Sequence, residues 1–411
     1  MAATDTPPST VANKKAQMGI IFLTVFIDLV GFGIVIPILP LYAKHFGASE
    51  TVNGLLVGAY SAMQFIFAPI LGKISDRVGR RPVLLVSLMG TVVGFAIMGF
   101  AGSLLWLFIA RIVDGISGGN ISTAQSYIAD ITTPEERTKA MGLIGAAFGL
   151  GFVLGPAIGG ILSNPALTGA HSDAAPFIFA SGLALINAIL VFIRLPESLS
   201  TEHRVQPEDR APISEVFKHG WHLPALMGSY FFSISGFAMM TTNYALFTHD
   251  RFGYNQSQNG YVFAFIGIIG ALVQGGLLRR LLKTKSEKSL AIIGVSLLIL
   301  GMAFLPLVTN LTTLLIATAT IGIGNSFVTP TLNGLASRSA ERSWQGRVIG
   351  LMQSAGSLAR WLAPMLAGRL LAMDVGQSYY GRTPFWTACA ILIIGLVITL
   401  QLPAKPITAA A

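Results

Sequence analysis

The sequence predicts an all-α integral membrane protein in which twelve transmembrane helices form two pseudo-symmetric six-helix bundles. Three observations predict this fold class: 53% hydrophobic against only 11% charged residues, a series of apolar runs of membrane-spanning length, and a repeat along the chain. Soluble domains carry about 25% charged residues. A water-soluble fold of 411 residues could not cover its surface with so few charges.

The apolar runs define the elements in order. A helix crosses the bilayer core in about 20 residues. By that length the predicted spans are 18–42, 51–72, 82–101, 104–126, 141–162, 176–194, 223–247, 259–280, 289–308, 311–335, 346–371 and 384–402. The predicted domains are an N-terminal tail (1–17), a first bundle (18–194), a linker (195–222), a second bundle (223–403) and a C-terminal tail (404–411).

Lysine and arginine predict the orientation, because cytoplasmic loops carry an excess of both. One set of loops holds Lys73, Arg77, Arg80, Arg81, Arg137, Lys139, Arg194, Arg204, Arg210, Lys218, Arg279, Arg280, Lys283, Lys285, Lys288, Arg338, Arg342 and Arg347. The opposite loops hold only Lys44, Arg251 and Arg382. This bias predicts that both tails and the linker are cytoplasmic. It also accounts for the net charge of +9 without a nucleic-acid partner.

The repeat has an offset of about 207 residues. Phe46-Gly47 recurs as Phe252-Gly253, Asn53-Gly54 as Asn259-Gly260, Pro156 as Pro364, Gly160 as Gly368 and Pro176-Phe177 as Pro384-Phe385. Because six is an even number of spans, the two halves run parallel, and a substrate site is expected near mid-membrane between them. The alternative is that the two bundles repeat for folding reasons only.

Asp28 is the clearest charge inside a span, within FIDLVGFGIVIPILP. A charge in the membrane interior costs several kcal/mol, and burial favours the neutral form of an acid. Asp28 is therefore predicted to carry a proton and to attract a cationic substrate. The alternative is a structural acid that is hydrogen-bonded to neighbouring helices.

Other polar residues lie within the spans. Arg111 and Asp114 share one helix face and are predicted to assist proton coupling, unless they only neutralise each other. Arg360 has no acid near it in sequence and is predicted to face the substrate or to pair with another helix. The predicted substrate cavity comprises Asp28, Gln64, Asn120, Gln125, Asn243, Gln274, Asn325, Gln353 and Arg360. Each uncharged member could instead serve helix packing.

Two motifs indicate moving parts. The charged island GKISDRVGRRP, residues 72–82, lies between two spans, and its predicted gating residues are Gly72, Asp76, Arg77, Gly79 and Arg80. Asp76 could accept hydrogen bonds from a helix N-terminus or from an arginine of another helix, in one conformation only. The alternative is a positively charged anchor. The fifth predicted span carries Gly151, Gly155, Pro156, Gly159 and Gly160, which allow close helix approach and a bend.

These motifs resemble those of the major facilitator superfamily. GKISDRVGRRPVLL resembles its motif A, Arg111 with Gly115 its motif B, and the glycines of the fifth span its antiporter motif C. Within the drug/proton antiporter branch, residues 59–90, SYIADIT (126–132) and DLVGFGIVIPILP are similar to tetracycline/proton antiporters. The resemblance is dense over 18–198 and weaker over 223–403, where the counterpart of the island, GGLLRRLLKTKSEKS, is degenerate.

The resemblance implies a secondary active transporter that exports amphiphilic small molecules or drugs by proton antiport and alternating access. We further expect a bacterial inner membrane, a monomer and no cofactor. One departure is that tetracycline exporters carry acids in their third and ninth spans, where this chain has Gly94 and the acid-free IIGVSLLILGMAF. The alternative function is a facilitator or proton symporter that imports a polar or anionic metabolite.

A membrane-embedded enzyme or a receptor is the rival from another class. The six histidines, His45, His171, His203, His219, His222 and His249, lie in loops or at span ends and form no ligand pattern. The single cysteine, Cys389, excludes an intrachain disulfide. The sequence therefore indicates neither an enzyme nor a metal site.

Overall fold

The computed structural model describes residues 11–199, 222–340 and 344–403, and within these ranges every regular element is a helix. The first half contains α1 (Val11–His45), α2 (Glu50–Val78), α3 (Arg80–Gly99), α4 (Leu104–Ser117), α5 (Asn120–Ile131), α6 (Pro134–Leu162), α7 (Pro165–Thr168), the short η1 (Gly169–His171) and α8 (Ala175–Arg194). The second contains α10 (His222–Phe252), α11 (Gln256–Leu272), η4 (Val273–Leu277), α12 (Leu278–Leu281), α13 (Glu287–Phe304), η5 (Leu305–Leu307), α14 (Leu311–Arg338), α15 (Gln345–Met373) and α16 (Arg382–Gln401).

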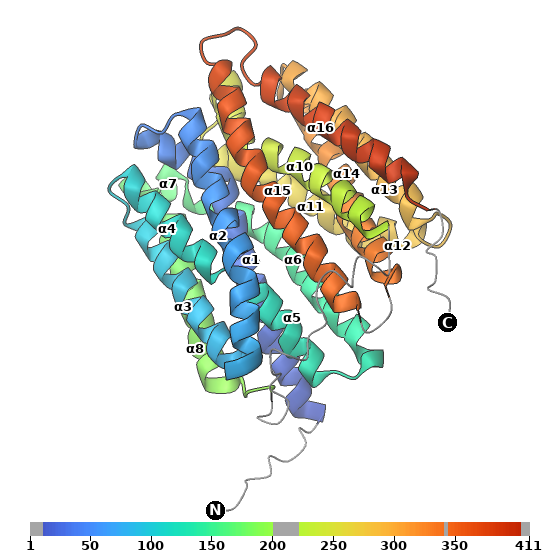
Figure 1. Ribbon diagram of the computed structural model, residues 1–411. Coiled ribbons are helices and arrows are strands. Elements are labelled where there is room, and N and C mark those ends of the chain that lie inside the picture. The colour runs from blue at the N-terminus through green and yellow to red at the C-terminus, as the bar shows by residue number, and fades with distance from the viewer. Residues whose placement is uncertain (1–10, 200–221, 341–343, 404–411) are drawn as a thin grey trace, which may run out of the picture.

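Twelve of these helical stretches correspond to the predicted spans. Ten are long and apolar enough to cross a membrane, with α4 and α5 as one stretch and α11 to α12 as another. The bent pair of α6 and α7 makes an eleventh. The twelfth is α15, whose 29 residues run beside α2 and α10 (Figure 1). The first helix begins at Val11, earlier than predicted, while most of the predicted linker and tails lies outside the described residues.

The repeat is visible in local structure at the start of the second helix of each half. Gly47 and Gly253 both adopt positive φ, at 79° and 69°, a conformation that glycine reaches without strain. Two residues later the side chains of Ser49 and Asn255 cap α2 and α11 by accepting hydrogen bonds from Val52 N and Gln258 N. A capping side chain satisfies one of the unpaired amides of the first turn. The repeated Phe-Gly pairs therefore mark equivalent turns.

Each half packs around its own apolar residues. One buried cluster draws only on residues between Leu223 and Leu402, and two others lie between Ile21 and Leu195. We call the end of the molecule where α1 begins and α16 ends the terminal side, and the opposite end, where α1 ends and α2 begins, the loop side (Figure 1). The domain boundaries remain predictions.

The two halves meet through repeated glycines on the loop side. A Cβ on Gly54 of α2 would lie 3.0 Å from the Cα of Gly368 in α15. In the equivalent crossing, a Cβ on Gly160 of α6 would lie 3.1 Å from the Cα of Gly260 in α11. Leu41 packs in a buried cluster with Ala245 and Leu246 of the second half at the same side. Small residues allow this close backbone approach.

Substitution of Gly54 tests whether this closed contact belongs to the working cycle. In an exposed helix interior, Gly→Ala stabilises by about 1 kcal/mol, but at Gly54 the new methyl would clash with the backbone of α15. For a transporter of the class that the sequence predicts, Gly54→Ala is therefore expected to hold the loop side open and to slow substrate flux, measured in proteoliposomes. The control is Gly182→Ala in α8, where a Cβ meets nothing within 4 Å. Equal flux in the two variants would contradict a role for this closure.

Candidate functional site

Asp28 lies near the middle of α1 and is partly exposed. Asn120, the first residue of α5, is buried and donates from Nδ2 to Asp28 Oδ1 over 2.7 Å. Apart from Asn120, no hydrogen-bond donor to this carboxylate is found in the described part of the chain. The carboxyl group is thus oriented by one neutral amide, on a residue that is partly exposed. This arrangement leaves room for a proton or a cationic ligand.

Arg111 and Asp114 form a buried pair beside Asp28. Their side chains approach to 3.6 Å between Nη1 and Oδ2, and the Arg111 guanidinium lies 4.6 Å from the centre of the Tyr60 ring. Within the described residues, Nε and Nη1 of Arg111 have no hydrogen-bond partner. Local neutralisation is therefore present but loose. Tyr60 of α2, which the sequence did not single out, adds a cation–π contact.

Gly94 explains how the acid of α4 is accommodated. It is the position in the third span where an acid was expected from the resemblance, and a Cβ there would lie 2.9 Å from the Cβ of Asp114. α3 and α4 could not pack this closely if both positions carried an acidic side chain. Asp114 therefore fills, from α4, the space beside a glycine of α3.

Arg360 lies in α15, the helix of the second half that packs on α2. It is partly exposed, donates from Nη2 to Ser357 Oγ over 3.1 Å and is near enough to Tyr60 to interact electrostatically. Among the described residues no carboxylate lies within 4.0 Å of its guanidinium. The structure thus brings a cation of the second half toward the Asp28 and Arg111 group of the first.

The uncharged polar residues of the predicted cavity fall into two groups. Asn243 is fully buried and donates to Ala367 O over 2.9 Å, so its amide joins α10 to α15. Gln64 bonds to Tyr60 Oη and Gly118 O, which ties α2 to the end of α4. The remaining residues are at least partly exposed: Gln125, Gln274, Asn325 and Gln353. Gln274 lies in η4, a short π-helical segment, a feature frequent at functional sites.

The glycines of α6 pack closely against α1, the helix that carries Asp28. A Cβ on Gly155 would lie 2.8 Å from the Cα of Gly33, and one on Gly151 would lie 3.0 Å from the carbonyl carbon of Leu29. Gly159 continues this face against Ile34, whereas Gly160 points to α11 of the second half. A Cβ on Gly33 would lie 2.9 Å from Pro156 Cδ, and a Cβ on Gly260 would lie 2.8 Å from Pro156 O. Through these residues, α6 packs against both α1 of its own half and α11 of the second half.

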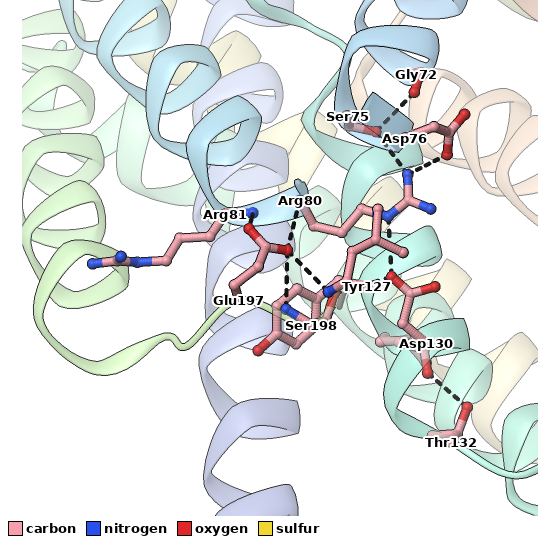
Figure 2. A network of polar contacts seen from close by, with 12 residues as sticks. Gly72, Ser75, Asp76, Arg80, Arg81, Tyr127, Asp130, Thr132, Glu197 and Ser198 are labelled. Carbon is pink, nitrogen blue, oxygen red and sulfur yellow. Dashed lines mark hydrogen bonds and ion pairs between the residues drawn. The ribbon is translucent and has the colours of Figure 1, made fainter. Parts of the chain in front are cut away.

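The charged island forms a polar network on the terminal side (Figure 2). Arg80, only 7% exposed, donates from Nη1 to Asp76 Oδ1 (2.6 Å) and Ser75 Oγ (2.8 Å), and from Nε to Asp130 Oδ2 (3.0 Å). Asp76 thus accepts a hydrogen bond from an arginine of another helix, which is one of the two kinds of partner predicted for it. Arg77, by contrast, is exposed. The Ser75 hydroxyl in turn donates to Gly72 O.

Glu197 completes this network from beyond the end of α8. Its carboxylate accepts from the backbone amides of Arg80 (2.8 Å) and Arg81 (3.1 Å), the first two residues of α3. Gly79 has φ of 112°, and a Cβ there would lie 2.7 Å from the Glu197 Cδ. An anion at a helix N-terminus satisfies free amides and the helix dipole. Only glycine leaves room for this cap.

Asp130 and Glu197 are network members that the sequence analysis did not select. Asp130 lies within SYIADIT, which carries part of the family resemblance, and Glu197 lies at the start of the predicted linker, 195–222. Asp130 follows Tyr127 by three residues, and the Tyr127 hydroxyl donates to Pro196 O. The sequence did hold a signal for both residues: each is an acid near the end of a predicted span, and the island at residues 72–82 is rich in arginine. No group of three His, Cys, Asp or Glu side chains that could hold a metal occurs in the described ranges.

The fold and this site place the chain among membrane transporters with two helical bundles. The family model described as Major Facilitator Superfamily matches residues 21–364. The chain belongs to the major facilitator superfamily.

Individual relatives match nearly the whole chain. It is 33% identical to the Escherichia coli tetracycline resistance protein, class C, over 94% of this chain and 95% of the relative. It is 29% identical to Bacillus subtilis (strain 168) multidrug resistance protein 2, over 97% of this chain and 98% of the relative. It is also similar to the crystal structure of the human organic anion transporter MFSD10, with 26% identity, a TM-score of 0.71 and coverage of 96% and 100%.

Proposed function

We propose that this chain is a proton-coupled exporter of amphiphilic small molecules in a bacterial inner membrane, with both termini in the cytoplasm. The observation that carries the proposal is the placement of Asp28, held by Asn120, on a helix that the glycines of α6 pack against. The names of the bacterial relatives, tetracycline and multidrug resistance proteins, support drug export. The excess of Lys and Arg on the terminal side supports the orientation.

In this orientation, the contacts between the halves on the loop side support an inward-facing state of the cycle. The glycine crossings and the Leu41 cluster join the halves on the loop side, which faces outward. Deprotonated Asp28 binds substrate from the cytoplasm. After the halves rock, a proton from outside displaces the substrate, and the protonated carrier returns. Arg111, beside Asp114, lowers the cost of a second negative charge near Asp28. The proposed site draws on residues of both halves of one chain, which supports a monomer as the working unit.

Arg360 suggests the chemistry of the substrate. The Arg360 guanidinium pairs with no carboxylate of the described residues, and a charge-assisted hydrogen bond to an acidic ligand group would be strong. At Asp28, a proton and a cationic ligand group compete for the same carboxylate. Protonation would not release a purely anionic ligand from a site that gains positive charge. We infer that preferred substrates are zwitterionic, with a cationic group at Asp28 and an acidic group at Arg360.

Replacement of Arg360 separates these two groups. Arg360→Gln is expected to weaken binding of a zwitterionic drug about tenfold, the equivalent of roughly 1.4 kcal/mol for one charge-assisted hydrogen bond. Binding of a matched cationic drug should change little, measured for both by scintillation proximity. The matched control is Arg369→Gln, since Arg369 is exposed in the same helix. An equal loss for both drugs would show that Arg360 supports the fold and not the ligand.

A further inference from the structure

Tyr60 of α2 occupies a slot on the surface of α4. The slot consists of Arg111, Gly115 and Gly118, whose spacing of four and then three residues places them on one helix face. A Cβ on Gly115 would lie 3.0 Å from the Cα of Tyr60, and a Cβ on Gly118, just beyond the end of α4, would lie 2.9 Å from its Oη. The Tyr60 side chain, only 6% exposed, therefore lies close against α4 because both positions are glycine.

Further contacts fix the orientation of the Tyr60 ring. Gln64, one turn further along α2, donates from Nε2 to Tyr60 Oη over 3.3 Å and to Gly118 O over 3.0 Å. The ring centre of Phe32 lies 5.8 Å from that of Tyr60, with the two rings tilted by 47°. Phe32 follows Asp28 by four residues on α1, about one helical turn. The ring is thus held by α1, α2 and the end of α4 together.

The charge of Arg111 is only partly satisfied by Asp114. Arg111 is 2% exposed, so its charge must be stabilised within the protein. Its distance to Asp114, 3.6 Å between Nη1 and Oδ2, is longer than a charge-assisted hydrogen bond, and Nε and Nη1 have no hydrogen-bond partner among the described residues. The guanidinium lies 4.6 Å from the Tyr60 ring centre, within the range over which a ring face attracts a cation. The ring therefore supplies stabilisation that Asp114 alone does not.

We propose that Tyr60 is a positioning residue that holds Arg111 beside Asp114 and away from Asp28. Tyr60 and Asp114 both interact electrostatically with Asp28, so Asp28 is the carboxylate to which a released Arg111 would turn. Among the described residues, Asp28 accepts a hydrogen bond from Asn120 alone. A guanidinium on Asp28 would compete with the cationic group of a substrate for the same carboxylate. The inference rests on the proposed role of Asp28 in binding.

The decisive test compares Tyr60→Leu with Tyr60→Phe in equilibrium binding of tetraphenylphosphonium, a permanent cation, measured by scintillation proximity. Tyr60→Leu removes the ring, and the affinity is expected to fall about tenfold as Arg111 turns to Asp28. Tyr60→Phe keeps the ring and loses only the hydroxyl, so it should bind within about twofold of the wild type. Equal losses in the two variants, or no loss in either, would overturn the proposal.

Arg111→Gln shows whether the effect of Tyr60 passes through Arg111. In that background Tyr60→Leu is expected to cause no further loss of affinity, because no guanidinium remains to move. A similar loss in both backgrounds would show that Tyr60 acts by packing alone and would overturn the proposal. Asp28→Asn, assayed in parallel, tests the proposed function itself. Unchanged affinity in Asp28→Asn would reject Asp28 as the cation site, and the proposal about Tyr60 with it.

A series that conserves shape keeps the test decisive should Tyr60→Leu fold poorly. Phenylalanines with increasing numbers of ring fluorines, placed at Tyr60, keep the shape of the ring while weakening the negative charge of its face. The affinity is expected to fall stepwise with each added fluorine, and equal affinity across the series would overturn the proposal. The control places the same analogues at Phe177 of α8, a buried ring that stacks on Tyr42. Affinity should stay constant there, and a matching stepwise loss at Phe177 would also overturn the proposal.

Discussion

Asp28→Asn is expected to abolish substrate export driven by a proton gradient while leaving the protein folded. Asparagine nearly matches aspartate in volume and can still accept the 2.7 Å hydrogen bond from Asn120 Nδ2. The variant is permanently neutral at this position, so it mimics only the protonated state. Concentrative uptake into inverted vesicles should fall to background, because proton binding can no longer displace substrate.

The matched control for Asp28 is Asp114→Asn. Asp114 is 6% exposed and paired with Arg111, whereas Asp28 is partly exposed and accepts a hydrogen bond from Asn120. We expect Asp114→Asn to shift the pH at which flux is half-maximal but to keep coupling. Intact proton-driven export in Asp28→Asn would reject Asp28 as the proton carrier. Loss of coupling in Asp114→Asn alone would transfer that role to Asp114.

Arg80→Gln is expected to have the second large effect, on both stability and transport. Removal of one partner from a buried ion pair costs about 3 kcal/mol or more, and here it leaves Asp76 and Asp130 without the cation that joins α2, α3 and α5. We expect a lower midpoint in a thermal unfolding assay and a flux reduced far beyond any loss in expression.

Arg77→Gln provides the comparison, since Arg77 is an exposed arginine of the same island. Surface charges contribute little, usually below about 1 kcal/mol, so its stability should stay close to that of the wild type. Equal unfolding midpoints for Arg77→Gln and Arg80→Gln would contradict the central place assigned to Arg80. Glu197→Gln should be intermediate, because its amide can keep part of the cap on α3.

Sequence reasoning predicted the architecture well because membrane constraints act along the chain. Span length and the repeat depend on local composition, and the equivalent turns at Gly47 and Gly253 have the same left-handed backbone. The family prediction is confirmed by the match over residues 21–364. Close helix packing at the glycines of α6 was also predicted, because small residues allow it whichever helix is the partner.

The partners of individual charges could not be predicted from sequence. Arg80 binds Asp130 fifty residues away, and Glu197 reaches α3 from beyond the end of α8. Such contacts depend on how helices cross in three dimensions.

The most direct test of proton-coupled export measures substrate and proton movement together in proteoliposomes of the wild-type protein. With an imposed pH gradient and a zwitterionic drug, we expect the drug to accumulate on the more acidic side while protons move from that side to the other. Asp28→Asn should stop both fluxes. Drug movement that ignores the pH gradient, or that runs in the same direction as the protons, would contradict it.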